Sequence, residues 1–199
     1  MKKILFALLL IVPVFVFSQY TEFKTEAAFI PNVGQFDGRN WQKNKIEFAI
    51  HEGNDYVFFT KKGLTYRFDR VIRNPELKEE AGDFEGEKLG LTERVTKSEL
   101  VHITWIGSNP DAQIISEEEI NSYFSYCIYQ DNEHKEVKNI NNIKGYKKLT
   151  YKNLYNNIDV VYTFHPDGGF EYSFILHPGA DVSQIKLNHY ALEVHRFVQ

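Results

Sequence analysis

The sequence predicts an all-β fold, an antiparallel β-sandwich-like domain with one short helix and a charged insertion. Short runs in which β-branched and aromatic residues alternate with polar ones recur along the chain, separated by clusters of Gly, Asn, Asp and Pro. The links between most runs are too short or too polar for the crossover helices that a parallel sheet needs. With 12 Tyr and 16 Phe, the chain has enough large apolar side chains for one sizeable core.

Residues 1–18 have the pattern of a secretory signal peptide. Two lysines precede an apolar run over residues 4–17, and Ser18 supplies a small residue before a cleavage point that we place at Gln19, with Tyr20 as a nearby alternative. The run is shorter than the roughly 20 residues that a membrane-spanning helix needs. We therefore expect export through a Sec-type signal and no stable membrane span after cleavage. A retained anchor is the alternative.

The mature chain, residues 19–199, is predicted to be a single β-rich extracellular domain. The whole chain has a net charge of −4, and loss of the two lysines of the signal makes it −6, so nucleic acid is not an expected partner. Cys127 is the only cysteine, which excludes an internal disulfide. Because Cys127 lies in the apolar run 125–129, we predict a structural thiol packed in a strand rather than a nucleophile.

In the N-terminal half, strands are predicted over residues 46–50 and 56–60, and the turn-rich residues 52–55 join them into a hairpin. A third strand follows over residues 64–69, where apolar and polar residues alternate strictly. The alternation places Leu64, Tyr66 and Phe68 inward and Thr65, Arg67 and Asp69 outward.

Residues 76–99 interrupt the strand pattern, because twelve of these 24 residues are charged. We do not expect such a segment to form a core strand. Asn74 and Pro75 give a helix start signal and Gly82 a stop signal, so we predict a helix of about two turns followed by a loop. We interpret the segment as a solvated insertion between two strands; a recognition loop is the alternative.

The C-terminal half is predicted to contain further strands, over residues 100–106, 123–129, 146–151, 158–164, 170–176 and 185–190. The clearest signal is the hairpin turn at residues 165–169, in which Pro166 fixes φ at the first corner and Asp167 and two glycines follow. We therefore predict that this hairpin is a core element. Its alternation lets Val160, Tyr162 and Phe164 face the same side as Phe170, Tyr172 and Phe174, which gives cross-strand aromatic pairs that favour one register.

The sequence contains no recognisable catalytic motif. Its seven histidines are scattered singly, and neither a zinc-binding spacing nor a calcium-loop motif occurs, so we expect no catalytic residue, no metal and no cofactor. Aromatic side chains in polar segments are candidates for stacking on carbohydrate. Trp41 is the candidate ligand-binding residue, because it lies in the polar stretch 38–43.

Four segments occur in a familiar order, residues 29–36, 63–68, 145–162 and 177–181. Together they resemble the N-terminal domain of unknown function of large secreted Bacteroidota proteins, over residues 28–190. In those proteins the domain precedes bacterial β-propeller repeats or polycystic-kidney-disease-like domains and a gliding-motility-associated C-terminal sorting domain. The resemblance implies no catalytic residue. It also implies that this chain is truncated at its C-terminus or is a fragment of a longer protein.

Two functional hypotheses follow. The first, which we favour, is a non-catalytic exported module, an adhesion or structural N-terminal domain of a secreted or cell-surface protein. The second is a secreted hydrolase or a carbohydrate-binding accessory domain, which exposed aromatic and abundant acidic residues would serve. Surface polysaccharide and other extracellular domains are the expected partners. The expected location is secreted or cell surface, or the periplasm if the sorting region is absent.

Overall fold

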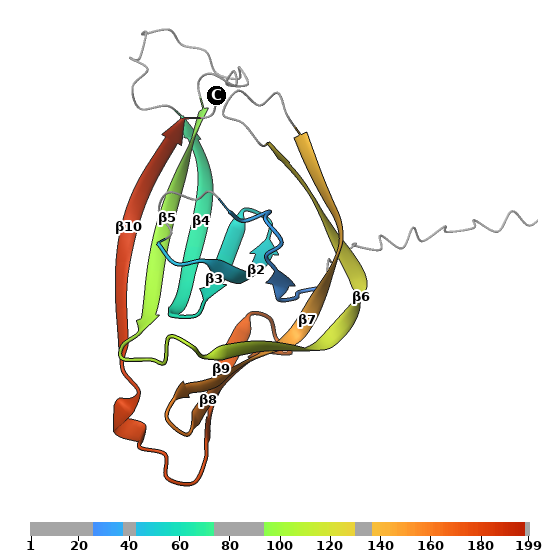
Figure 1. Ribbon diagram of the computed structural model, residues 1–199. Coiled ribbons are helices and arrows are strands. Elements are labelled where there is room, and N and C mark those ends of the chain that lie inside the picture. The colour runs from blue at the N-terminus through green and yellow to red at the C-terminus, as the bar shows by residue number, and fades with distance from the viewer. Residues whose placement is uncertain (1–25, 38–42, 74–93, 130–136, 198–199) are drawn as a thin grey trace, which may run out of the picture.

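Two antiparallel sheets form the protein in the computed structural model (Figure 1). The structure describes residues 26–37, 43–73, 94–129 and 137–197, apart from the side chains of Arg94, Tyr129 and residues 193–197. Within these ranges the fold is all-β and sandwich-like, as the alternating runs predict. The predicted signal peptide, the predicted helix after Pro75 and Trp41 lie outside the described residues.

The larger sheet has six strands in the order β1-β2-β3-β4-β5-β10. Their bounds are β1 Ile30–Pro31, β2 Ile46–Glu52, β3 Asp55–Thr60, β4 Gly63–Arg73, β5 Arg94–Trp105 and β10 Leu187–Phe197. Strands β2 to β5 are neighbours in the sequence as well as in the sheet, which confirms the predicted hairpin between β2 and β3. Strand β10 returns from the far end of the sequence to pair with β5, at the left in Figure 1.

The smaller sheet has four strands in the order β6-β7-β8-β9. Their bounds are β6 Gln113–Tyr129, β7 Val137–Tyr155, β8 Ile158–Phe164 and β9 Phe170–Leu176. Figure 1 shows the long β6–β7 hairpin curving upward opposite the larger sheet. The pairing of β6 with β7 shifts register between Glu119 and Tyr123, and Glu118 has a positive φ of 60°. Such irregularities bend a strand pair and increase its twist, which accounts for the curvature.

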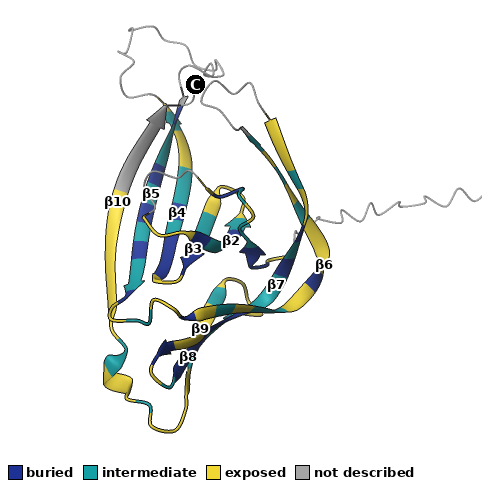
Figure 2. Cartoon of the chain, viewed as in Figure 1, coloured by how far each residue is buried: buried dark blue, intermediate teal, exposed yellow. Residues whose placement is uncertain are grey.

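Aromatic side chains from both sheets form the main core. Figure 2 shows in dark blue the buried stretches of the strands that carry it. The ring of Phe59 packs edge-on against Phe29 and Tyr162, with centroid distances of 5.3 and 5.2 Å. Tyr151 of β7 is fully buried and donates a hydrogen bond of 3.0 Å from its hydroxyl to the carbonyl oxygen of Thr60 in β3. Burial raises the pKa of Tyr151 well above its ordinary value, so the hydroxyl keeps the proton that joins the two sheets.

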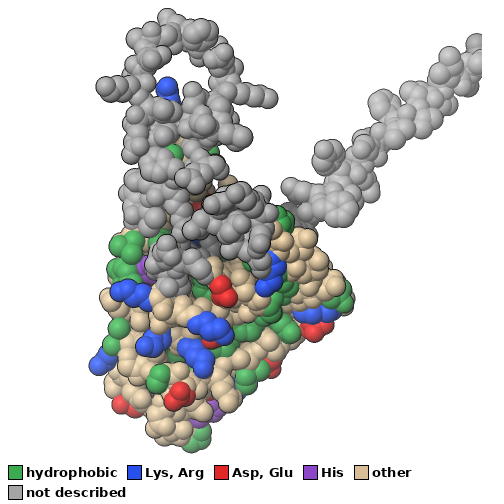
Figure 3. Space-filling model, turned by 45° about the horizontal axis from the view of Figure 1, so that its top comes forward, with side chains coloured by type: hydrophobic (Ala, Val, Ile, Leu, Met, Phe, Trp, Pro, Cys, Tyr) green, Lys and Arg blue, Asp and Glu red, His purple; other side chains and the backbone are tan. Residues whose placement is uncertain are grey.

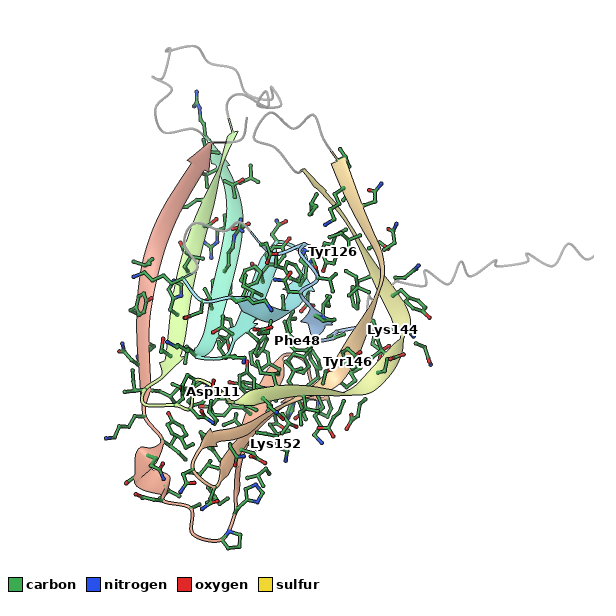
Figure 4. All side chains as sticks on the ribbon, in the orientation of Figure 1. Phe48, Asp111, Tyr126, Lys144, Tyr146 and Lys152 are labelled. Atoms are coloured by element: carbon green, nitrogen blue, oxygen red, sulfur yellow. The ribbon has the colours of Figure 1, made fainter. Side chains whose placement is uncertain are left out.

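A second buried cluster lies on the opposite face of the larger sheet, and its members are Ile30, Phe36, Ile46, Ala49, Phe58 and Ile143. Tyr126 of β6 packs edge-on against Phe36, with ring centroids 5.3 Å apart. Figure 4 shows Tyr126 on the inner side of the curved β6–β7 hairpin. The hairpin and the segment around β1 therefore cover this face near β2 and β3.

This second layer corrects the predicted orientation of β4. Leu64 is buried as predicted, but Thr65 and Arg67, predicted to face outward, are only 2% and 7% exposed. The Arg67 guanidinium makes a two-point ion pair with Asp69, and the Ser98 hydroxyl donates to the same carboxylate over 2.6 Å. The prediction failed because it assumed that only one face of the sheet was buried.

The charged insertion is also shorter than predicted. Residues 94–99, predicted to belong to it, form the first half of β5, in which Ser98 is buried. Lys97 and Glu99 lie on either side of Ser98 along the strand, and both side chains stay partly exposed in an ion pair of 3.8 Å. Alternation therefore lets a highly charged segment bury one face.

Cys127 is a third correction, because its thiol is exposed rather than packed. Among the described strands, β6 pairs only with β7, so Cys127 lies on an edge strand. Its neighbour Tyr126 packs against the second cluster, and the alternation of the strand directs Cys127 to the opposite side. The apolar neighbours in the sequence therefore do not bury this thiol.

The predicted β8–β9 hairpin is confirmed with the predicted bounds, and its cross-strand pairs include Val160–Phe174, Tyr162–Tyr172 and Phe164–Phe170. Beyond β9, the described chain contains a 3-10 turn, η2 Val182–Gln184, which the sequence pattern did not predict. No helix among the described residues is long and apolar enough to span a membrane.

Candidate functional site

Three hollows of about 320, 270 and 340 Å³ indent the described surface. Their size is near the lower limit of small-ligand pockets, about 300 Å³. The first lies on the face of β4, β5 and β10, and we call it the sheet-face hollow; its lining includes Lys43, Asn44, Lys62, His102, Tyr190 and Leu192. The predicted site residue Trp41 lies outside the described residues, so the structure does not test it.

A row of three paired residues forms the floor of the sheet-face hollow. Thr65 of β4, His102 of β5 and Tyr190 of β10 are direct cross-strand neighbours, so their side chains share one face. The Thr65 hydroxyl oxygen lies 2.9 Å from His102 Nδ1, and the His102 ring stacks on Tyr190 with centroids 4.7 Å apart. Burial lowers the pKa of His102, so this imidazole is neutral near pH 7.

Tyr190 is the exposed member of this row. It is 46% exposed, whereas His102 and Thr65, on the same face of the sheet, are buried. The hydrogen bond between Thr65 and His102 limits rotation of the imidazole, and the imidazole supports one face of the Tyr190 ring. The arrangement therefore presents a phenol ring in a fixed orientation, and its remaining surface can contact a ligand.

Lys62 reaches the rim of the hollow because of the tight turn between β3 and β4. The Thr60 hydroxyl accepts a hydrogen bond from the Lys62 backbone N–H (3.2 Å) and donates one to the Gly63 carbonyl oxygen (3.0 Å). Gly63 has a φ of 148°, and a Cβ at this position would lie 2.0 Å from the Ile103 carbonyl oxygen. Only glycine fits this approach of β4 to β5, which positions the Lys62 backbone.

Positive charge borders the sheet-face hollow. Lys43 and Lys62 are both exposed, and neither forms an ion pair with another described residue. Its described lining contains no Asp or Glu. Figure 3 shows Lys and Arg side chains interspersed with Asp and Glu on the visible face, and the chain as a whole is acidic. The local charge of the hollow is thus opposite to the net charge of the protein.

The second hollow is acidic, and we call it the acidic hollow; Glu26, His51, Glu52 and Phe124 contribute to its lining. Glu26 makes an ion pair of 2.9 Å with Lys147. The His51 ring stacks on Tyr56 with centroids 4.1 Å apart, and its Nε2 lies 3.0 Å from the Gly53 carbonyl oxygen. Two carboxylates bordering one hollow are the minimum that glycoside hydrolysis requires.

Asp159 is a buried carboxylate held by three hydrogen bonds. It is 2% exposed and accepts hydrogen bonds from Lys152 Nζ (2.7 Å), the Asn153 backbone N–H (2.8 Å) and His177 Nε2 (3.0 Å). Burial alone would raise the pKa of Asp159, but these hydrogen bonds outweigh it and lower the pKa to about 2. Lys152, labelled in Figure 4, and Asn153 lie near the end of β7, and His177 follows β9. The carboxylate therefore joins strand ends.

A family model described as "Domain of unknown function (DUF7948)" matches residues 29–196. The chain belongs to this family. No curated protein and no solved structure was found to match it.

The DUF7948 match begins at the first residue that connects the two sheets. Phe29 exchanges two backbone hydrogen bonds with Tyr146 of β7, of 2.8 and 3.0 Å. From there the match covers both sheets and every residue named above for the sheet-face hollow. The family description assigns no chemistry, so the functional argument for a DUF7948 domain depends on its geometry.

The residues of the sheet-face hollow were not predicted from the sequence. Thr65 was expected to face outward, and His102 and Tyr190 were not distinguished from other strand residues. Only the register of β4, β5 and β10 brings them together, and β10 is more than 80 residues from β5 in the sequence. Within the described part of the DUF7948 domain, no group of three or more His, Cys, Asp or Glu residues could hold a metal ion.

Proposed function

We propose that this DUF7948 domain is a non-catalytic exported module, an adhesion or structural N-terminal domain of a secreted or cell-surface protein. The observation that carries the proposal is the edge strand β10. It is eleven residues long, and β5 is its one partner among the described strands. Its exposed residues include the apolar Leu187, Tyr190 and Leu192. Proteins normally shorten, charge or cover such an edge, so a neighbouring extracellular domain is the partner we assign to it.

The roles of the buried polar groups support a structural module. Tyr151 joins the two sheets, and Asp159 joins three chain segments. The Tyr155 hydroxyl lies 3.1 Å from the carbonyl oxygens of both Ile106 and Lys186, between the ends of β5 and β10. The hydrogen bonds of each of these groups hold parts of the fold together, which is the role of a structural group and not of a ligand-binding one.

The sequence context agrees with this proposal. The N-terminal signal pattern favours export, and the ordered segments resemble the first domain of large Bacteroidota proteins that continue into β-propeller repeats and a gliding-motility-associated sorting domain. In such a protein the domain would be secreted or held at the cell surface, or would stay in the periplasm without the sorting region. Surface polysaccharide is a second expected partner, and nucleic acid is not expected.

A secreted hydrolase or carbohydrate-binding accessory domain remains the alternative. The feature that favours a hydrolase is the acidic hollow, where Glu26 and Glu52 border one cavity. Hydrolysis would require one of them to act as an acid and the other as a base or nucleophile. The ion pair between Glu26 and Lys147 favours a structural role for this carboxylate instead.

The experiment that tests the proposal is sedimentation of the purified mature chain, residues 19–199, with envelope material from the source cells. We expect co-sedimentation without release of reducing sugars or peptides. The double variant Leu187→Lys/Ala191→Lys should weaken co-sedimentation, because charge on an edge strand opposes strand docking. Asn54→Lys, in the exposed β2–β3 turn, is the matched control and should behave as the unaltered chain. Substrate turnover that Glu26→Gln or Glu52→Gln abolishes would establish the hydrolase alternative instead.

A further inference from the structure

We propose that the sheet-face hollow binds an acidic polysaccharide, a polymer whose sugar rings carry carboxylates. This inference deepens the proposed function, on which it depends, by naming a ligand for the adhesion module. It rests on three features of the hollow: an exposed aromatic ring in a fixed orientation, two exposed lysines, and a described lining that contains no acidic residue.

The aromatic ring accounts for recognition of a sugar. A pyranose ring has an apolar face of C–H groups that packs on an aromatic side chain. Tyr190 offers such a surface, and the stacked His102 and its contact with Thr65 hold the ring in place before any ligand arrives. A rigid platform costs little conformational entropy on binding, so weak stacking contributes more of its energy to affinity.

The lysines are the reason for proposing a sugar that carries acidic groups. Lys43 and Lys62 border the hollow from two separate segments, the approach to β2 and the β3–β4 turn. Charge complementarity therefore selects an anionic ligand. The exposed Asn44 lies beside Lys43 and can exchange hydrogen bonds with sugar hydroxyls. The neutral imidazole of His102 adds no charge, so the two ammonium groups are the charges of the described lining.

The position of the hollow favours a polysaccharide over an acidic peptide. An extended peptide would pair with the outer backbone edge of β10, whereas the hollow lies on the face of the sheet, over β4, β5 and β10. Side chains that project from a sheet face do not offer the backbone partners that an extended peptide needs. A sugar chain needs only a stacking surface, hydroxyl partners and countercharges.

The test is isothermal titration calorimetry of the mature chain with polygalacturonate, and with fully methyl-esterified polygalacturonate, which has the same sugar without the charge. We expect binding to the charged polymer and binding at least about tenfold weaker to the ester, because a hydrogen-bonded charge pair is lost. Tyr190→Ala and Lys62→Gln should each weaken binding by about tenfold at unchanged thermal midpoint. Lys62→Gln is an exposed turn substitution, so it remains informative if Tyr190→Ala fails to fold.

Lys61→Gln is the matched control, because Lys61 precedes Lys62 in the same turn but lines the third hollow, beside Phe48 and Ile114. It should bind polygalacturonate as the unaltered chain does. Equal loss in Lys61→Gln and Lys62→Gln would show diffuse charge attraction and overturn the site. Equal binding of poly-glutamate would overturn the sugar assignment in favour of an acidic peptide.

The edge variant Leu187→Lys/Ala191→Lys separates the two proposals. It should weaken envelope co-sedimentation but keep polygalacturonate binding, because Leu187 and Ala191 lie on the sheet face opposite Tyr190. Absence of polygalacturonate binding in a chain that still co-sediments would refute the polysaccharide site alone. Absence of co-sedimentation in a chain that binds the polymer would refute the docking role of β10 alone.

Discussion

Asp159 illustrates at the scale of one residue how this fold tolerates a buried charge. An isolated carboxylate in an apolar interior is costly, so it must accept hydrogen bonds or be neutralised. Asp159 accepts three, two of them from the side chains of Lys152 and His177, which are each about half exposed. The side chains of these partners therefore remain partly in solvent while the carboxylate is buried.

We predict that Asp159→Asn destabilises the protein at pH 7 by about 1–3 kcal/mol, because an amide cannot replace all three acceptor contacts. Asp159 has a folded-state pKa of about 2, below its ordinary 3.8. A depressed pKa adds stability that is complete above the ordinary value and is lost as the pH falls through the folded-state value. Urea melts from pH 5 to pH 2 should therefore show a loss in the unaltered chain that is smaller in Asp159→Asn. Parallel pH profiles would contradict this role.

Cys127 gives a second prediction at the residue scale. Because its thiol is exposed on the edge strand β6, a thiol reagent should label the folded protein nearly as fast as the urea-unfolded chain. Measurement of labelling by absorbance or mass spectrometry with and without urea gives the two rates. A large acceleration on unfolding would show that the thiol is protected and that the described side of β6 is covered.

At the scale of elements, the β8–β9 hairpin is the unit in which local signals and tertiary packing agree. Its turn residues, its alternation and its register are all visible in the sequence and all confirmed. The two strands differ in burial, however. Ile158, Val160 and Tyr162 of β8 are fully buried, whereas β9 is an edge strand whose Phe174 is only partly buried.

This difference changes the mutational prediction for the hairpin. Ile158→Ala should cost about 2–5 kcal/mol, the range for removal of a fully buried Ile side chain. Phe174→Ala should cost less than the about 3–5 kcal/mol typical of a buried Phe, because part of its ring remains in solvent. Glu171→Ala, exposed on β9, is the control and should change stability by less than about 0.5 kcal/mol. Chemical denaturation of the three variants checks the order, and a larger loss for Phe174 than for Ile158 would reverse our assignment.

The elements that the sequence predicts well are those whose signals are local. The turn at Pro166 needs only its neighbours, whereas β6 and β7 extend through Glu- and Asn-rich segments that resemble loops. Asn142 lies at a register shift and Glu118 lies just before one, and both have a positive φ, a conformation that Asn tolerates better than most residues. The exposure of Cys127 and the cross-strand row ending at Tyr190 depend on curvature and on long-range pairing, which no local pattern encodes.

At the scale of the whole molecule, the segment before β2 unites the two sheets. Phe29 bridges to β7 while Ile30 pairs with β2, and both side chains are fully buried. The segment contributes to both buried clusters, Phe29 to one and Ile30 with Phe36 to the other. Removal of this segment would therefore expose both clusters at once.

Gly145 tests this junction. A Cβ at Gly145 would lie 2.6 Å from the Ala28 Cβ and 2.8 Å from a ring carbon of Phe124, which is closer than such atoms approach in real structures. Gly145→Ala should therefore destabilise the protein by about 1–3 kcal/mol, the usual cost of overpacking. Gly53 lies in the open β2–β3 turn, and a Cβ there would meet no atom within 4 Å. Any loss of stability in Gly53→Ala should therefore come from the backbone strain of its positive φ and not from overpacking.

Thermal melts and hydrogen exchange distinguish the two glycine variants. Gly145→Ala should accelerate exchange in both sheets, because the junction serves both, whereas the effect of Gly53→Ala should stay near the β2–β3 turn. Acceleration confined to one sheet in Gly145→Ala would show that the sheets are stabilised independently.

The pairing of β10 with β5 also determines how the domain would resist mechanical force. Eleven consecutive register pairs join the two strands, from Leu187 with Trp105 to Phe197 with Val95. The hydrogen bonds of an antiparallel pair run across the strands, so tension along the β10 axis loads them together in shear. Tension at right angles to that axis loads them one after another and peels the strand away. The direction in which a tether pulls on β10 therefore decides whether this domain yields at high or at low force.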